Sequence, residues 1–245
     1  MKKRVPLFLC LSLLAGSFST SVLAETVHVC TSGSWVPFSN IGEKSDEHGL
    51  HTQKVIALFE ALDEDLKLHE APWKRCLKMV ETGEMDAAYS ASYNEERADY
   101  AFYPSVSLGR VTHIAVTIKG VSNSWDEDRD LEDLPQPVGS PLGYSVTRDL
   151  LKEGKGQVVS TSYDDEQNLR LLLEGKLGSV ILTPETLEEF FSTKSADCPI
   201  EVLSPPYREG NEVFMILSKL YRNDPARAAD LLMRIDKALA GINRS

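Results

Sequence analysis

The sequence predicts an α/β protein made of two similar lobes, each with a mixed sheet flanked by helices. Strand-like and helical segments alternate at the spacing typical of a sheet covered by helices. In addition, a helix that ends at a glycine and leads into a short apolar strand occurs twice, about 92 positions apart. The first copy turns at Gly83 and the second at Gly175. Two copies of one unit favour two lobes of similar construction.

The first half of the chain supplies most of the first lobe. Residues Thr26–Thr31 form a β-rich apolar strand. Gly49–Leu62 is predicted to be a helix because its apolar residues recur on one side. Leu66–Leu68 is a short second strand. Pro72 then opens a helix that stops at the first glycine named above, the positions that proline and glycine favour at helix ends. Met85–Ser90 returns as a third strand.

The second half repeats this arrangement. Asp164–Glu174 is predicted to be helical and Leu177–Thr183 to be a strand. Between the two halves, the acidic and proline-punctuated stretch 122–137 has no helical period, so we predict surface linkage there. Near the end, Glu212–Ser218 is a strongly apolar strand. An Asp-Pro pair at 224–225 then begins a final helix with one apolar face.

The first 24 residues have the pattern of a secretory signal peptide. Met1–Arg4 is positively charged, residues 5–18 are apolar, and Val22–Ala24 ends in the small residues of a cleavage site. The apolar run is shorter than the roughly 20 residues of a membrane-spanning helix. We therefore predict removal of residues 1–24 and export of the remainder to the periplasm.

The charge balance is acidic. The 26 basic and 37 acidic residues give a net charge of −11. Because the first 24 residues hold three of the basic residues and none of the acidic ones, the remainder has a net charge of −14. Such a surface repels phosphate backbones and anionic lipids, which argues against nucleic acid or a membrane surface as partner. An apolar fraction of 42% suffices for a packed core.

No cofactor or metal is predicted. The sequence contains no glycine-rich phosphate loop. His48 and His51 are spaced as two ligands on one helix edge, but no third ligand is indicated. His28 and His113 stand singly in apolar strands and are expected to be structural residues whose hydrogen bonds are satisfied.

Three cysteines follow the signal segment: Cys30, Cys76 and Cys198. Export permits a disulfide, and an odd number leaves one thiol over. Cys30 lies in a predicted strand and Cys76 in a predicted helix of the same lobe, so this pair is favoured. The alternative is three buried thiols that behave as small apolar side chains.

The most informative stretch follows the third strand. Ser90 and Ser92 lie where that strand is expected to end, and Arg97 arrives as a helix or turn begins. Ligands of open α/β sheets bind beyond the carboxyl ends of the strands. Hydroxyls, free backbone N–H groups and a guanidinium fork together form a carboxylate receptor. The alternative is that Arg97 is a solvated surface charge that pairs with Glu95 or Asp99.

The run G-E-M-D-A-A-Y-S-A-S-Y-N-E-E-R at 83–97 resembles the amino-acid-type solute-binding proteins of ABC transporters, the bacterial extracellular solute-binding protein family 3. The likeness extends to W-V-P-F after the first strand, to V-G-x-x-x-G-x-S at 138–145, and to the strand Phe214–Ser218 with the helix after it. It implies the periplasmic binding protein type II fold. We expect residues 25–117 and 211–245 to form the first lobe and residues 118–210 the second.

The resemblance also implies a ligand site of seven residues: Trp35, Trp73, Ser90, Ser92, Arg97, Ser145 and Thr183. The first-lobe serines and the arginine would hold a ligand carboxylate, and the two tryptophans would sandwich the ligand body. Ser145 would add a hydrogen bond from the start of a second-lobe helix. Thr183 stands where relatives that bind α-amino acids place an Asp for the ammonium group, so a carboxylate without that group is an open alternative.

These features predict a solute-binding protein rather than an enzyme. It would capture a small polar, carboxylate-bearing ligand by hinge closure and deliver it to a membrane permease, working as a monomer. One alternative is a dehydratase-like enzyme on the same scaffold, for which Glu185 or His51 would be the general acid. The other is an exported ligand-sensing module.

Overall fold

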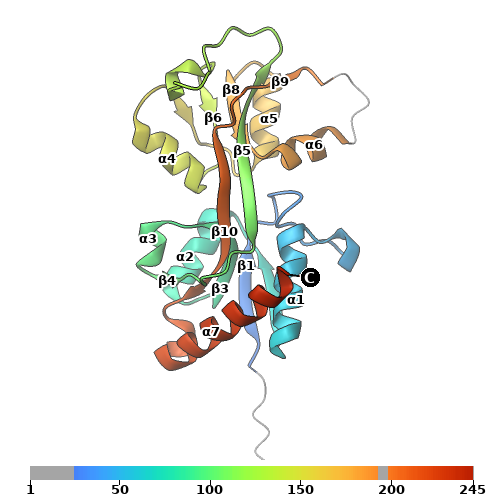
Figure 1. The fold of residues 1–245 in the computed structure, drawn as a ribbon, viewed down its shortest axis with the longest axis vertical. Coiled ribbons are helices and arrows are strands. Elements are labelled where there is room, and N and C mark those ends of the chain that lie inside the picture. Colours follow the sequence, from blue (N-terminus) through green and yellow to red (C-terminus); the bar gives the residue numbers. More distant parts are fainter. Residues whose placement is uncertain (1–24, 193–197, 245) are drawn as a thin grey trace, which may run out of the picture.

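The computed structural model describes residues 25–192 and 198–244, so the predicted signal peptide lies outside the described residues. The molecule has two halves, one above the other, joined by two long strands (Figure 1). No helix in the described part of the chain is long and apolar enough to cross a membrane.

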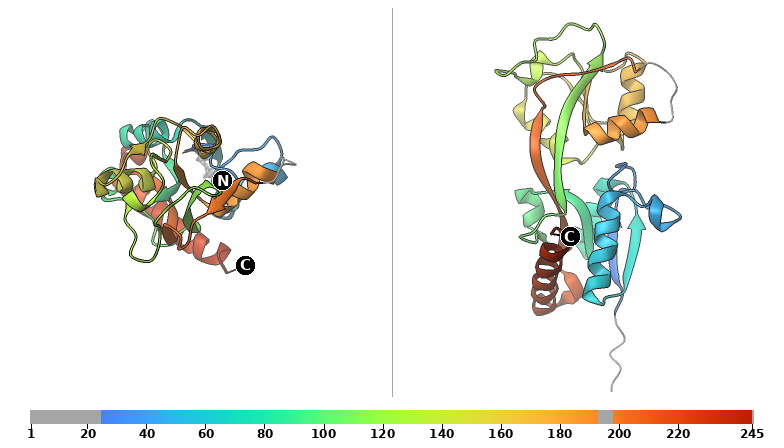
Figure 2. Two further views of the ribbon diagram at one scale, coloured as in Figure 1. Left: turned by 90° about the horizontal axis from the view of Figure 1, so that it is seen from above. Right: turned by 45° about the vertical axis from the view of Figure 1, so that its right-hand side comes forward.

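The half that contains both ends of the described chain is called the first lobe here. Its parallel strands β2, β1 and β3 lie side by side, and β10 joins the sheet antiparallel to β3. Helices α1 and α7 pack together against one face of the sheet (Figure 2), and α2 covers the other. The elements of this lobe are β1 (Val27–Thr31), η1 (Ser45–Glu47), α1 (Leu50–Leu62), β2 (Leu66–Glu70), α2 (Trp73–Thr82), β3 (Ala87–Ser92), α3 (Glu95–Ala98), β4 (Ala101–Phe102), η3 (Tyr221–Asn223) and α7 (Pro225–Ile242).

The other half is called the second lobe. Its strand β6 pairs in parallel with β7 and β8. Helices cover both faces of this sheet, and a separate apolar cluster lies on each face. Its elements are η2 (Leu131–Asp133), β6 (Val138–Gly139), α4 (Ser145–Glu153), β7 (Val158–Val159), α5 (Asp165–Leu173), β8 (Ser179–Leu182), α6 (Pro184–Ser192) and β9 (Ile200–Val202). Both lobes therefore have the mixed sheet flanked by helices that the sequence predicts.

The two connecting strands are β5 (Gly109–Ile118) and β10 (Arg208–Ser218). Strand β5 pairs with β10 up to His113 and with β8 from Ile114 onward, so its partner changes in mid-strand. Strand β10 begins four residues earlier than predicted, because its polar first residues pair with β5 in the connection between the lobes. The division of the chain into 25–117 with 211–245 and 118–210 remains a proposal.

The local signals for helix ends act as expected. Gly83 ends α2 with a φ of 75°, as predicted, whereas α1 begins one residue later than predicted and has Gly49 as its N-cap. The carboxylate of Asp224 accepts hydrogen bonds from the backbone N–H groups of Ala226 and Arg227 at the start of α7.

The stretch 122–137 departs from the predicted surface linkage. Trp125, Leu131 and Leu134 are all at most 8% exposed and belong to an apolar cluster of the second lobe. A segment without helical or strand periodicity can still contribute to a core, since burial requires only a few apolar side chains at the right places.

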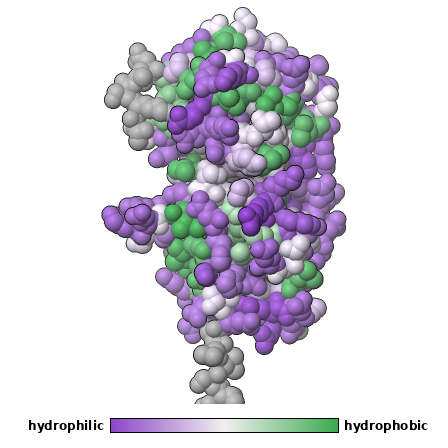
Figure 3. All heavy atoms as spheres, turned by 180° about the vertical axis from the view of Figure 1, so that it is seen from behind, coloured by the Kyte–Doolittle hydropathy of each residue, from purple (hydrophilic) through white to green (hydrophobic). Residues whose placement is uncertain are grey.

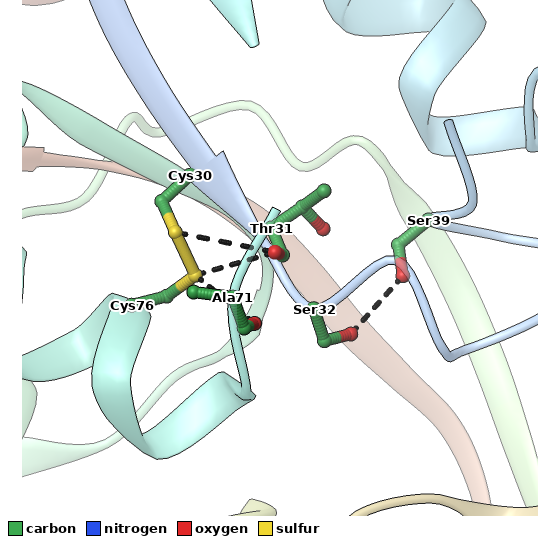
Figure 4. Close-up of a disulfide and its surroundings, with 6 residues drawn as sticks. All are labelled: Cys30, Thr31, Ser32, Ser39, Ala71 and Cys76. Atoms are coloured by element: carbon green, nitrogen blue, oxygen red, sulfur yellow. Dashed lines mark hydrogen bonds between the residues drawn. A yellow bond between two sulfur atoms is a disulfide. The ribbon is translucent and has the colours of Figure 1, made fainter. Parts of the chain in front are cut away.

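The disulfide joins Cys30 and Cys76, the pair that the sequence favours, and Cys198 is a free cysteine. Figure 4 shows that it ties the end of β1 to the first turns of α2, immediately before the loop that carries Ser32. The outer surface seen in Figure 3 is mostly hydrophilic, with apolar residues in small groups, and its outline narrows between the two lobes.

Candidate ligand-binding site

A cavity between the lobes brings together six of the seven residues that the sequence singled out. They are Trp35, Trp73, Ser90, Ser92, Arg97 and Ser145. The first five come from the first lobe, and Ser145 begins helix α4 of the second. Four further residues complete the lining: Ser32, His113, Tyr144 and Val146. None of these ten residues is an Asp or a Glu.

Arg97 is the one charged side chain of the lining. It lies in the short helix α3, whose N-cap Asn94 accepts a hydrogen bond from the backbone N–H of Glu96. The side chain is buried, with 4% exposure, so Arg97 is not a solvated surface charge. Its Nη1 donates to the carbonyl oxygen of Ser92 at 2.9 Å and its Nη2 to that of Gly143 at 3.2 Å. The guanidinium lies 5.6 Å from the ring centroid of Trp73.

The described residues give this buried guanidinium no carboxylate partner. The residues that influence it most are two tyrosines and a second cation, Arg148, and burial is the largest cause that lowers the pKa of Arg97. A buried charge is costly unless it is paired and hydrogen-bonded. Since the two carbonyl contacts and the neighbouring hydroxyl of Tyr103 leave part of the five-donor fork unused, the arrangement suits an anionic group that enters the cavity.

The two serines lie at the end of β3 rather than in a loop beyond it. The strand begins two residues later than predicted and continues to Ser92, because the backbone pairs with β10 as far as that residue. Ser90 has a φ of 68°, and its Oγ lies 3.0 Å from Nδ1 of His51. The Oγ of Ser92 accepts a hydrogen bond from Nδ2 of Asn211 at 2.8 Å. Both hydroxyls are thereby held in place.

Two tryptophans form apolar walls of the cavity. Trp35 follows β1, and Trp73 is the first residue of α2; each is 7% exposed. The disulfide links β1, which precedes Trp35, to α2, which begins at Trp73, and so fixes the two elements that carry these side chains relative to each other. The ring of Trp35 packs against Phe38 at 4.7 Å and meets Tyr144 of the second lobe edge-on at 6.3 Å.

The turn before α4 brings the second lobe into contact with the first. Gly143 has a φ of 86°, and a Cβ at this position would lie 3.3 Å from the Cβ of Lys74 in α2. Glycine permits this left-handed backbone and brings the Gly143 carbonyl within reach of Arg97. The next residue, Tyr144, has a buried hydroxyl close to those of Ser32 and Ser34, and burial raises its pKa well above the usual value.

Thr183 lies outside the lining of this cavity. It is 1% exposed, and its hydroxyl lies 2.9 Å from that of Thr186, within hydrogen-bond distance. Thr186 in turn donates to the carbonyl oxygen of Val36 at 2.7 Å. Thr183 is thereby linked to the first lobe through Thr186.

Sequence reasoning missed the other lining residues for different reasons. Ser32 and Tyr144 could have been found from their positions, since Ser32 follows the end of β1 and Tyr144 precedes Ser145 in its motif. Nothing in the sequence around His113 indicates a ligand site. The expectation that the hydrogen bonds of His113 are satisfied is wrong. Its Nδ1 is buried without a partner in the part of the chain that the structure describes, and the side chain is 6% exposed.

Burial controls the protonation of the site. It lowers the pKa of His51 to about 4, with Lys54 adding to the effect, and it lowers the pKa of His113 to about 4. Both imidazoles are neutral at pH 7. Burial also raises the pKa of Asp165, at the first turn of α5, to about 7. Within 25–192 and 198–244, no group of three His, Cys, Asp or Glu side chains could hold a metal ion.

Two lobes joined by two crossing strands, with a cavity between them, define the periplasmic binding protein fold of type II. Solved structures confirm this assignment. An ancestral arginine-binding protein bound to arginine matches with a TM-score of 0.73 and 18% identity, over 90% of this chain and 93% of that one. The arginine-, lysine-, histidine-binding protein ArtJ from Geobacillus stearothermophilus matches with a TM-score of 0.70 and 18% identity, over 90% of both chains.

A histidine kinase sensor domain with similarity to periplasmic binding proteins also matches, with a TM-score of 0.74 and 17% identity, over 89% of this chain and 90% of that one. No protein-family model and no curated protein sequence matches the chain. At this level of identity, the structural matches establish the fold. The ligand has to be inferred from the site itself.

Proposed function

We propose that the protein is an exported solute-binding protein that captures a small carboxylate-bearing ligand between its lobes and delivers it to a membrane transporter. The observation that supports this best is Arg97, a buried guanidinium without a carboxylate partner in a cavity lined by both lobes. A ligand carboxylate would accept its free N–H groups, and Ser90 and Ser92 would add hydroxyl donors.

The two lobes supply a means of enclosing the ligand. Strands β5 and β10 are the connection about which the lobes would move, as in the hinge closure of this fold class. The hydrogen bonds from Arg97 to Gly143 and from Thr186 to Val36 cross between the lobes and stabilise the closed arrangement. Trp35 and Trp73 would cover the ligand body and exclude water.

The test is a thermal-shift screen of amino acids and organic acids, followed by calorimetry on Arg97→Lys. Lysine keeps the charge but loses the fork that binds both oxygens of a carboxylate. We expect at least a tenfold loss of affinity for the carboxylate ligand. Arg110→Lys is the matched control, since Arg110 is exposed and pairs with Glu212 away from the cavity. Equal affinity of wild type and Arg97→Lys would contradict the proposal.

A second candidate is a sensing module that presents its ligand-bound form to a membrane receptor. It is favoured by the structural match to a histidine kinase sensor domain. A permease gene beside this gene would support transport, and a kinase gene would support sensing. The enzyme alternative has less support, because the lining residues include no carboxylic acid and the predicted acid His51 is neutral at pH 7.

A further inference from the structure

His113 lines the cavity from strand β5, one of the two strands that connect the lobes. It is paired with Arg208 across the two connecting strands, and the next residue of β5, Ile114, already pairs with Leu182 of the second lobe. The imidazole therefore belongs to the connection between the lobes and at the same time lines the cavity. A group bound here would touch both the ligand site and the hinge.

One ring nitrogen of His113 has no hydrogen-bond partner in the described part of the chain. Its Nδ1 is buried without a partner in the described chain, whereas Nδ1 of His51 meets Ser90 and Nδ1 of His28 meets His69. An unsatisfied buried polar atom destabilises the folded state, so such an atom in a side chain that lines a cavity indicates a partner that arrives from outside.

The charges around His113 restrict that partner. Arg208 of β10 and Asp149 of α4 are its charged neighbours, and they form an ion pair with each other at 2.9 Å. On the cavity side, Arg97 is the one charged lining residue, and no acidic residue is among the lining side chains. A cationic ligand group would find no acidic side chain in the lining, and a second carboxylate would exceed the single positive charge that Arg97 supplies.

We propose that His113 is a ligand-contacting residue that selects carboxylate ligands whose second polar group is uncharged, such as a hydroxyl, a carbonyl or an amide. This inference rests on the proposed function, because it assumes that Arg97 binds the carboxylate. It excludes basic side chains, in contrast to the arginine-binding proteins that share the fold. A neutral imidazole can both donate and accept one hydrogen bond, which suits any of these three groups.

The test is calorimetry with three pairs of carboxylates: pyruvate and L-lactate, malonate and succinate, and L-arginine and L-lysine. We expect the tightest binding within the first pair. His113→Phe keeps a ring but removes both nitrogens, and we expect it to weaken that binding at least tenfold. His113→Asn places an amide nitrogen near the position of Nδ1 and should restore part of the affinity. His69→Phe, outside the cavity, is the control, and thermal melts of each variant verify folding.

The outcomes separate the two proposals. Binding that is tightest for the second or third pair, or that is equal in wild type and His113→Phe, overturns the role of His113. If such binding still depends on Arg97, the proposed function stands without it. If no member of the panel binds the wild-type protein, both proposals are contradicted.

Discussion

Nη2 of Arg97 lies 3.2 Å from the carbonyl oxygen of Gly143, and this contact joins the two lobes. The same side chain is the one positive charge that faces the cavity. Because one guanidinium contacts the opposite lobe and would also hold a carboxylate, ligand binding and lobe closure are expected to depend on each other. A ligand that engages Arg97 would stabilise the closed form in proportion to its preference for that form.

Gly143→Ala should impair closure. The added Cβ would lie 3.3 Å from Lys74 Cβ, and the φ of 86° is unfavourable for alanine. Gly120→Ala is a matched control, since Gly120 has a φ of 82° but nothing within 4 Å of the added atom. Both variants should lose about 1 kcal/mol of folding stability, and only Gly143→Ala should lose ligand affinity and show a larger radius of gyration by X-ray scattering. Equal affinities of the two variants would argue against the contact.

Thr186→Val removes the hydroxyl that donates to Val36 across the cleft. A hydrogen bond of this kind contributes about 1 kcal/mol, which corresponds to a roughly fivefold shift between open and closed forms. Ligand affinity measured by calorimetry should therefore fall about fivefold. Thr82→Val is the control, because the Thr82 hydroxyl donates to Lys78 within its own helix. An equal loss of ligand affinity in Thr82→Val would mean that the contact between Thr186 and Val36 does not contribute to closure.

Replacing Cys30 and Cys76 together by alanine should destabilise the first lobe. The bridge spans 46 positions, and the chain-entropy model gives about 4 kcal/mol for a loop of this size. Urea denaturation, with and without a reducing agent, measures the effect. Cys198→Ser should leave the midpoint nearly unchanged, since that cysteine is free. A reductant-insensitive wild-type midpoint would contradict a stabilising disulfide.

Acid should weaken the fold through the two buried histidines. Burial holds the pKa of His113 at about 4, against about 6.5 in the unfolded chain, with Arg208 lowering it further and Asp149 raising it. Between these values the unfolded chain binds more protons, so stability falls as the pH drops from 6.5 towards 4. At pH 5, His113 by itself is expected to lower the free energy of unfolding by on the order of 2 kcal/mol.

The measurement is urea denaturation at pH 7 and pH 5 of wild type and His113→Asn. The variant should lose less stability than wild type over this interval, because it cannot take up the proton. Asp165 acts in the opposite direction, since its raised pKa of about 7 favours the folded state as the pH falls. Its contribution is common to both proteins and cancels in the comparison. Identical pH dependence would mean that His113 is not held neutral by the fold.

Much of the fold could be predicted because its signals are local. Helix caps such as Gly49, Gly83 and Asp224 act within one turn, and the apolar faces of α1 and α7 follow from helical periodicity. The polar start of β10 could not be predicted this way, because its strand conformation depends on pairing with β5, about 100 positions away along the chain. The burial of Trp125 was missed for the same reason, since its partner Tyr207 lies about 80 positions away along the chain.

By itself the sequence determined the alternation of strands and helices, the acidic character of the chain and the group of residues around Arg97. These depend on composition, on local backbone preferences and on motifs within a few residues. The tertiary structure decided which of those residues meet: that Arg97 reaches Gly143, that Asn211 holds Ser92, and that His113 lines the cavity. Such contacts depend on how two strands cross between the lobes, and no local pattern records that geometry.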